Sequence, residues 1–305
     1  MKTRVITPLR TAIAAGAVGA VLLSGQAAGA VGARPGPVGA EPAARAAAVR
    51  VGTFNIDAGV AVDRWAQAVR DFSTHVDIGG LQEATGKEKT AALKAVPGIA
   101  SYVSPRYRQQ PIFWNSSLFS LIKGRAPKTA GGRQVERLGG GVTHQETTRA
   151  TVARLRSKTT GRTISVIDVH LLPNAVRQGR RVRGVPRRLA MYEQQVHKLG
   201  KIVAREKKWA DGPVWVLGDF NDNYRADKRR HKHKLAYATM HRHGLVAAWE
   251  AVKGKLQPGQ GSGTRSGSYL DVVWSPQKAT SVAVLREEAF QVGQHYPVVS
   301  TYRMP

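Results

Sequence analysis

The segment VWVLGDFNDN, residues 214–223, decides both the fold and the first candidate site. Its apolar first half is typical of a buried strand, and Gly218 then allows a sharp turn. Asp219, Asn221 and Asp222 follow as a cluster of oxygen-bearing side chains at the carboxyl end of that strand. An ordinary turn is the alternative interpretation, because Asp and Asn side chains can bond their own backbone.

Five more segments repeat this order of an apolar strand with polar residues at one end. They are TFNID (53–57), LQEA (81–84), DVHL (168–171), LDVVW (270–274) and QHYPVV (294–299). Other strands are predicted at 101–103, 111–114, 117–122, 147–155, 163–172 and 280–285, and helices at 62–72, 87–96, 187–209 and 235–243. Two successive runs of alternating elements predict two similar halves packed sheet against sheet.

The start of the chain has the three parts of a secretory signal peptide. A basic stretch, a short apolar run and small residues ending at Ala30 predict a signal over 1–30, and therefore export. A transmembrane anchor is disfavoured because the apolar run is shorter than the roughly 18 residues that a span requires. Residues 31–48 are rich in Ala, Pro and Gly and predict a disordered leader, so we expect the folded domain to span 49–305.

Composition excludes several classes of chemistry. The chain of 305 residues is 42% hydrophobic, enough for a large core, and it contains no cysteine. Zinc–thiolate sites, cysteine nucleophiles and redox chemistry are therefore excluded. Four histidines form two His-x-His pairs, His231 with His233 and His241 with His243. Zinc or nickel could bind them on adjacent strands, but we interpret them as cationic surface.

The positive charge is large and unevenly distributed. The formal charge is +27, or 27 − 3 = +24 without the three cations of the signal, which indicates a polyanionic partner or a solubility surface. Residues 177–188 hold six arginines, and residues 225–234 hold six Lys or Arg. We expect these clusters to bind phosphates on either side of a cleft, through Arg177, Arg180, Arg181, Arg229 and Arg230. The glycine-rich segment 131–141 is interpreted as a loop without chemistry.

Taken in order, the six segments resemble the motifs of the endonuclease/exonuclease/phosphatase superfamily. This superfamily includes deoxyribonucleases, abasic-site endonucleases, inositol polyphosphate phosphatases and sphingomyelinases. The resemblance implies an α/β (α+β) fold, a four-layer αββα sandwich of two mixed sheets between helices. It also implies cleavage of phosphoester bonds with the help of a divalent metal.

The resemblance further implies roles for individual residues. Glu83, with Asn55 beside it, matches the metal ligands, and His170 matches the histidine that contacts the phosphate or the leaving group. Asp219 and Asn221 match the pair that orients water and phosphate. Asp271 and His295 match the pair in which a carboxylate holds an imidazole, and Arg149 resembles a phosphate-contacting arginine.

Oxygen ligands and the absence of thiols favour Mg²⁺, with Mn²⁺ or Ca²⁺ as alternatives. One position departs from the family pattern, because Gln294 stands where the family has an aspartate. An amide oxygen can still coordinate a cation, so we expect Gln294 to be a weak metal ligand. The same change would also fit a non-catalytic member of the family.

The sequence therefore predicts an exported metal-dependent phosphodiesterase, with nucleic acid as its substrate and no protein partner or stable membrane insertion implied. A sphingomyelinase-like enzyme is the second hypothesis, and it requires an exposed aliphatic or aromatic hairpin, which we do not expect in these loops. A polyanion-binding protein with a vestigial site is the third.

Overall fold

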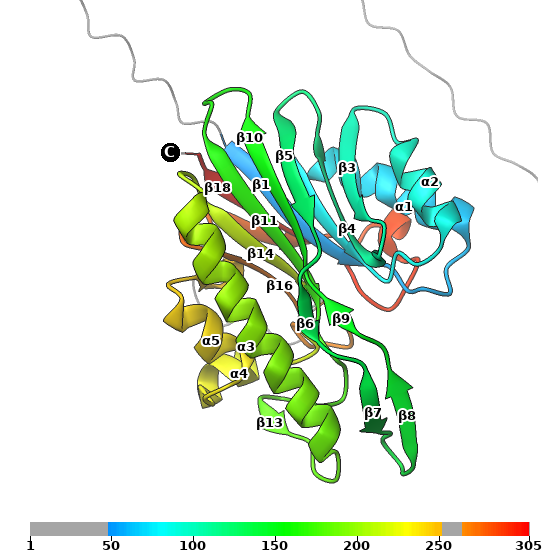
Figure 1. Ribbon diagram of the computed structural model, residues 1–305. Coiled ribbons are helices and arrows are strands. Elements are labelled where there is room, and N and C mark those ends of the chain that lie inside the picture. Colours follow the sequence, from blue (N-terminus) through cyan, green and yellow to red (C-terminus); the bar gives the residue numbers. More distant parts are fainter. Residues whose placement is uncertain (1–47, 252–263, 305) are drawn as a thin grey trace, which may run out of the picture. The chain divides into compact units, whose positions relative to one another are not determined.

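The computed structural model describes residues 48–251 and 264–304 of the chain. The predicted signal peptide, all but the last residue of the leader, residues 252–263 and residue 305 lie outside this range. Within it, two six-stranded sheets pack face to face (Figure 1). Among the described helices, none has the length and apolar character needed to cross a bilayer.

The two large sheets have the same internal order. The first is β17 (Ser281–Val284), β18 (Val298–Arg303), β1 (Ala48–Asn55), β2 (Ile78–Gln82), β4 (Tyr107–Asn115) and β3 (Ile99–Ser104). The second is β15 (Val246–Ala247), β16 (Asp271–Ser275), β14 (Val214–Asp219), β11 (Thr163–His170), β10 (Thr151–Ser157) and β5 (Phe119–Arg125). In each, the third and fourth strands are parallel and all other neighbours are antiparallel. The prediction of two similar halves is confirmed.

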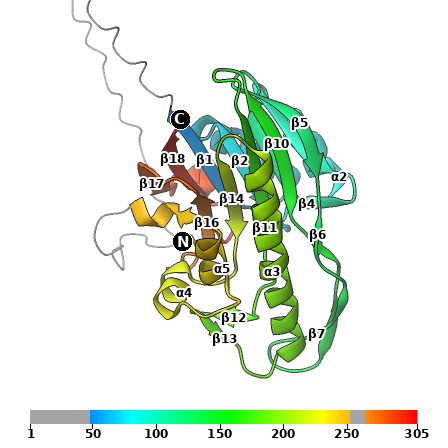
Figure 2. The same cartoon turned by 60° about the vertical axis from the view of Figure 1, so that its left-hand side comes forward.

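Helices cover the outer face of each sheet. α1 (Val62–His75) and α2 (Lys87–Lys94) lie on the first sheet, while α3 (Pro186–Trp209), α4 (Tyr224–Arg230) and α5 (Ala236–Arg242) lie on the second (Figure 2). Short 3₁₀ helices occur at η1 (Ala248–Ala251) and η2 (Glu288–Phe290). The predicted αββα sandwich is confirmed, and helix 62–72 extends to His75.

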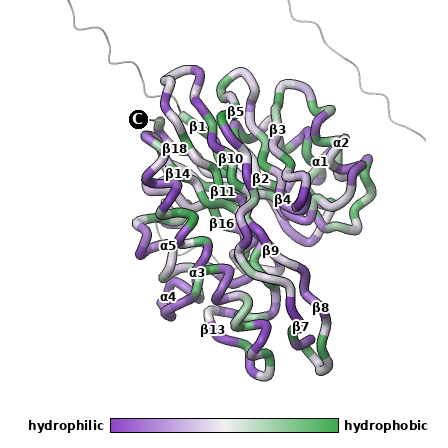
Figure 3. Tube along the Cα trace, in the orientation of Figure 1, coloured by the Kyte–Doolittle hydropathy of each residue, from purple (hydrophilic) through white to green (hydrophobic). Residues whose placement is uncertain are grey.

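Three apolar layers hold the sandwich together. Trp114, Trp215 and Leu217 belong to the layer between the sheets, and all three are almost fully buried. The outer layers form because α1 turns Trp65 and Phe72 towards the first sheet at helical spacing, and α3 does the same on the second. Figure 3 shows the hydrophobic residues concentrated in the central strands.

A buried polar network crosses between the sheets. The Gln82 side chain in β2 donates from Nε2 to Oδ1 of Asp168 in β11 at 2.6 Å, and Thr53 Oγ1 donates to Gln82 Oε1 at 3.1 Å. Burial raises the pKa of Asp168 well above its ordinary value. These contacts join the two sheets one or two residues before the polar ends of their strands.

Three small hairpins or strand pairs lie outside the large sheets. They are β6 (Lys128–Ala130) with β9 (Thr148–Arg149), β7 (Arg133–Glu136) with β8 (Val142–Gln145), and β12 (Val176–Arg177) with β13 (Arg180–Arg181). β7 and β8 project beyond the sandwich (Figure 1).

Three sequence predictions are corrected here. The segment 131–141 is not a loop throughout, because β7 and the tip of its hairpin lie within it. The predicted strand 147–155 is divided at Ala150, whose N–H bonds Pro127 O instead of either large sheet. The hairpin also exposes Leu138 and Val142, so the expectation of no exposed aliphatic hairpin is wrong.

Candidate active site

The polar ends of six segments meet at one edge of the sandwich. β1 and β2 are parallel, with Asn55 opposite Gln82, so Asn55 and Glu83 leave the first sheet together. β11 and β14 are parallel in the second sheet, which places His170 opposite Asp219. The antiparallel β16 places Asp271 opposite Asp219 from the other side. Carboxyl ends of parallel strands and amino ends of antiparallel neighbours share an edge, and this arrangement gathers the side chains there.

Oδ2 of Asp219 is the atom on which these side chains converge. Asn55 Nδ2 donates to it at 3.1 Å and Asn221 Nδ2 at 3.2 Å. His170 Nε2 lies 3.5 Å away and His295 Nε2 lies 3.9 Å away. Because Asp219 is only 1% exposed, these contacts take place in a poorly solvated environment.

A carboxylate fixes the orientation of the second imidazole. His295 Nδ1 lies 2.7 Å from Asp271 Oδ2, which directs Nε2 towards Asp219. Burial opposes protonation of this imidazole, but the Asp271 carboxylate, with Asp219 behind it, raises the pKa of His295 to about 9. At neutral pH His295 therefore carries a positive charge beside Asp219.

Oxygen atoms suited to a hard cation lie next to this group. Asn55 Oδ1 is buried and has no hydrogen-bond partner among the described residues. Glu83 has a φ of 60°, and its carboxylate accepts from Asn55 Nδ2 at 3.4 Å and from Ala58 N–H at 3.0 Å. Asp219, Asp271 and His295 also form a buried group whose ligand atoms lie within 4.8 Å of one another. The oxygens of Asn55 and Glu83 are the donors that fit Mg²⁺, Mn²⁺ or Ca²⁺, whereas His295 in its charged form has no lone pair to offer a metal.

This geometry is accompanied by a family match. Residues 52–292 match the model of the endonuclease/exonuclease/phosphatase family. The chain belongs to this family. Its members typically depend on a divalent metal and act on phosphoesters.

Solved structures of the endonuclease/exonuclease/phosphatase fold resemble this chain at low sequence identity. A Bacteroides vulgatus member has a TM-score of 0.61 at 16% identity, covering 85% of this chain and 100% of its own. A Bacteroides thetaiotaomicron mannosyl-6-phosphatase has a TM-score of 0.56 at 14% identity, and the match covers 83% of this chain and 98% of that protein. TDP2 from D. rerio, solved with a single-strand DNA product, has a TM-score of 0.55 at 13% identity. That match covers 83% of this chain and 98% of the TDP2 chain. No curated protein sequence matches the chain significantly.

The Gln294 side chain joins Arg265 to Asp57. Its Oε1 accepts a hydrogen bond from Arg265 Nη2, and its Nε2 donates to Asp57 Oδ2 at 3.3 Å. In this arrangement the amide oxygen is occupied by Arg265, and the expectation that Gln294 is a weak metal ligand stays a prediction. Arg265 Nη1 also lies 3.4 Å from Nε2 of His295.

Sequence reasoning missed Asp57, Arg265 and Lys89. Asp57 stands within the TFNID motif, so its signal was present. Lys89 is buried and donates to Ala58 O at 3.0 Å, which supports the loop after β1, and burial lowers its pKa despite Asp57 and Glu83. Arg265 follows a segment rich in Gly and Ser and had no sequence signal.

The two basic clusters lie together, not on opposite sides of a cleft. Arg230 Nε in α4 donates to Gln178 O in the turn between β12 and β13 at 2.9 Å, and Asn223 Nδ2 donates to the Gln178 side chain at 2.9 Å. The close fit follows from Gly179, whose added Cβ would lie 2.7 Å from Ala226 O. The expectation of opposite placement is therefore wrong.

The candidate arginines differ in their surroundings. Arg177 lines a hollow beside Asn221, whereas Arg181 is paired with Glu193 at 2.9 Å. Arg180 and Arg229 are exposed. Arg149 donates to Ala126 O at 2.7 Å and lines a second hollow.

Three of the four histidines in the His-x-His pairs are exposed and the fourth is half-buried. The His231 and His241 rings lie 5.8 Å apart, and His241 stacks on Tyr237. Within the described residues, none of the four belongs to a cluster of three or more potential ligands. The interpretation as cationic surface stays a prediction.

Proposed function

We propose that this protein is an exported, divalent-metal-dependent phosphodiesterase that hydrolyses strands of nucleic acid. The convergence of two imidazoles and two amides on Oδ2 of Asp219 carries the proposal. A buried carboxylate with this many oriented neighbours, next to oxygens suited to a hard cation, is an arrangement that phosphoester hydrolysis requires.

Glu83 and Asn55 would hold the ion, and Asp57 lies close enough to Gln294 to add a carboxylate at the same edge. When bound, a divalent cation supplies positive charge against the phosphoryl oxygens. Burial of Asn55, at 2% exposed, keeps its side chain in one orientation towards that position.

The other catalytic roles fall to side chains of the protein. Asp219 accepts the proton of the attacking water as the new P–O bond forms and the bond to the leaving oxygen breaks. His295, held in its cationic form by Asp271, and Arg265 beside it stabilise the negative charge on the phosphoryl oxygens. His170 lies on the other side of Asp219 and contacts the phosphate or the leaving oxygen.

Arginines on two sides of this group favour a polymeric substrate. One hollow contains Arg177 and Arg265, and a second, which begins at Thr85 two residues after Glu83, contains Arg106, Arg108 and Arg149. Without residues 1–30 the formal charge is 27 − 3 = +24, which adds long-range attraction for nucleic acid. The fold neighbour TDP2, captured with a single-strand DNA product, is consistent with such a substrate.

The activity test compares substrates and metal conditions. Purified protein without residues 1–30 is incubated with plasmid DNA, single-stranded DNA and RNA, and a sugar phosphate, each with Mg²⁺ or EDTA. We expect hydrolysis of nucleic acid that EDTA abolishes, and a loss of at least about 10³-fold in kcat in Asp219→Asn and in His295→Gln. Asp63→Asn, exposed at the start of α1, is the matched control. Cleavage that persists in EDTA would refute the metal requirement.

Export has a separate test. The sequence of the first 30 residues supports it, and sequencing the N-terminus of protein recovered from the culture medium should find Val31 first. Protein that stays in the cells and begins at Met1 would contradict the proposal without affecting the catalytic one.

The exposed hairpin tip favours a lipid phosphodiesterase as the second candidate. Leu138 is 52% exposed and Val142 is 53% exposed, and two aliphatic side chains beside cationic surface could contact a membrane. This candidate would be favoured if the protein hydrolyses sphingomyelin vesicles but not nucleic acid, and if Leu138→Ser reduces the hydrolysis of the vesicles. A protein that binds DNA but hydrolyses neither substrate would be the vestigial member.

A further inference from the structure

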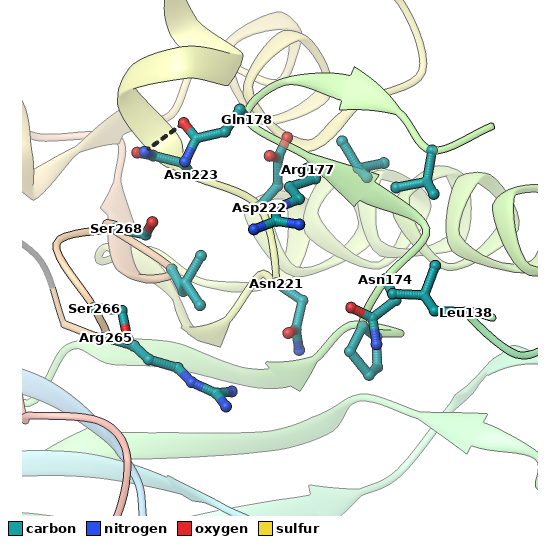
Figure 4. Close-up of a pocket in the computed structure, with 14 residues that line it drawn as sticks. Leu138, Asn174, Arg177, Gln178, Asn221, Asp222, Asn223, Arg265, Ser266 and Ser268 are labelled. Atoms are coloured by element: carbon teal, nitrogen blue, oxygen red, sulfur yellow. Dashed lines mark hydrogen bonds between the residues drawn. The ribbon is translucent and has the colours of Figure 1, made fainter.

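A hollow of about 570 Å³ borders the catalytic group at Asn221 and Arg265 (Figure 4). We call it the flanking pocket, and its polar lining includes Asn174, Arg177, Gln178, Asn221, Asp222 and Arg265. Apolar side chains, among them Pro173, Val176 and Leu270, line the rest. This volume and mixed lining are typical of a pocket for a small organic unit with a few oriented polar groups.

Arg177 is a cation available to a ligand in this pocket. It ends β12 opposite Arg180 in β13, but only Arg177 is part of the lining. In the part of the chain that the structure describes, Arg177 has no hydrogen bond or ion pair with another side chain. Arg181, the last residue of β13, is in contrast bound to Glu193. A free guanidinium at a concave wall is suited to a phosphate.

The backbone around the pocket is held in unusual conformations. Asn174, Gln178, Asn221 and Ser266 all have positive φ values, of 62°, 53°, 50° and 45°, and all four line the pocket. Non-glycine residues in this region are uncommon, and they gather where structure is held for a ligand. The pocket is therefore built by its loops and is not an incidental gap between them.

Asp222 provides a second polar group without a partner. Its side chain is 3% exposed, and Oδ1 accepts from Gly179 N–H at 2.8 Å, while Oδ2 has no hydrogen bond among the described residues. A buried acceptor of this kind calls for a donor, such as a sugar hydroxyl or the amino group of a base.

We propose that the flanking pocket binds the nucleotide unit adjacent to the scissile phosphate, with Arg177 receiving the next phosphate along the strand. The proposal rests on the proposed function and names the form of its substrate. Arg265 lies within 3.4 Å of His295 at the catalytic end, whereas Arg177 reaches the pocket from a different element, the β12–β13 hairpin. Two cations at separate places fit two successive phosphates better than a single phosphomonoester. A concave pocket between them accepts a base that is free of its complementary strand, so the bound strand is single.

Binding without turnover provides the first test. A fluorescent single-stranded DNA octamer and the same sequence in a duplex are titrated in EDTA, and the anisotropy is measured. We expect the wild type to bind the single strand at least about tenfold more tightly than the duplex. Arg177→Gln should weaken single-strand binding about tenfold. The affinity of Arg177→Lys should lie between those of the wild type and Arg177→Gln.

Arg180→Gln is the matched control. It removes the same charge from the same hairpin. Arg180 lies outside the pocket lining, so we expect less than about twofold weakening, although the sequence alone predicted a phosphate contact there. In steady-state hydrolysis of the octamer with Mg²⁺, Arg177→Gln should raise KM about tenfold and change kcat less than about threefold. An equal loss in the two variants, or equal binding of single strand and duplex by the wild type, would overturn the proposal.

The outcomes separate this inference from the proposed function. If nucleic acid is hydrolysed but Arg177→Gln and Arg180→Gln behave alike, the pocket assignment fails and the activity stands. If no phosphodiester is hydrolysed while Arg177→Gln still weakens binding selectively, the activity fails and the pocket assignment stands.

Discussion

Replacing Asp222 with asparagine should stabilise the protein at neutral and alkaline pH. The substitution keeps the shape of the side chain, and its Oδ1 can still accept from Gly179 N–H. The amide nitrogen takes the place of Oδ2, which has no partner among the described residues. The variant therefore removes a buried negative charge without removing a hydrogen bond.

The magnitude follows from the pKa of Asp222, which burial and the nearby Asp227 raise to about 7 from 3.8. A carboxyl whose pKa is raised in the folded state does not lower the free energy of unfolding at pH values below its pKa in the unfolded chain. As the pH rises from that pKa to the pKa in the folded state, the carboxyl destabilises the native state increasingly. About three pKa units correspond to an upper limit of about 4 kcal/mol. We expect a gain of about 1–4 kcal/mol at pH 8, and close to none at pH 4.

Urea unfolding of the wild type and the variant, followed by tryptophan fluorescence in EDTA at both pH values, measures this difference. Asp63→Asn serves as a control for loss of one exposed negative charge. The reasoning that burial raises the pKa of Asp222 would be refuted by either of two results. One is a variant no more stable than the wild type at pH 8, and the other is an equal gain in stability at both pH values.

Three further predictions concern the scaffold and the metal. Glu206→Gln should destabilise the protein by about 3–5 kcal/mol in the same urea assay, because Glu206 is fully buried in contact with Arg125 and Arg154 and its loss leaves two cations unpaired. Gln294→Asp should tighten Mg²⁺ binding at least about tenfold in calorimetry, since it adds a carboxylate beside Asp57, and an unchanged affinity would contradict this placement. Gly218→Ala should give no folded protein by near-UV circular dichroism, because at its φ of 136° the new Cβ would lie 1.9 Å from Val169 O; a native spectrum would refute this.

The polar residues that end successive strands were predictable from local pattern alone. Asp219 and His170 follow apolar runs whose period identifies strands, and Asp271 precedes one. Parallel pairing within each half then requires such ends to lie at one edge. The helix at 187–209 was equally readable, because its apolar spacing repeats over many turns.

Neither the contacts of Gln294 nor the pocket beside Asn221 could be predicted from local sequence pattern. Gln294 contacts Asp57 across a separation of 237 residues, and Arg265 occupies its amide oxygen. The two basic clusters meet because Gly179 lets α4 approach the β12–β13 hairpin.

The sequence by itself determined the strands, the helices and the polar residues at the strand ends, because each depends on a short period of hydrophobicity and on local turn chemistry. Only the tertiary structure decided which of these side chains touch, and which arginine of the β12–β13 hairpin lines the pocket and which pairs with Glu193. Those properties depend on distances between segments far apart in the chain, and such distances are set by how the two sheets and their loops pack.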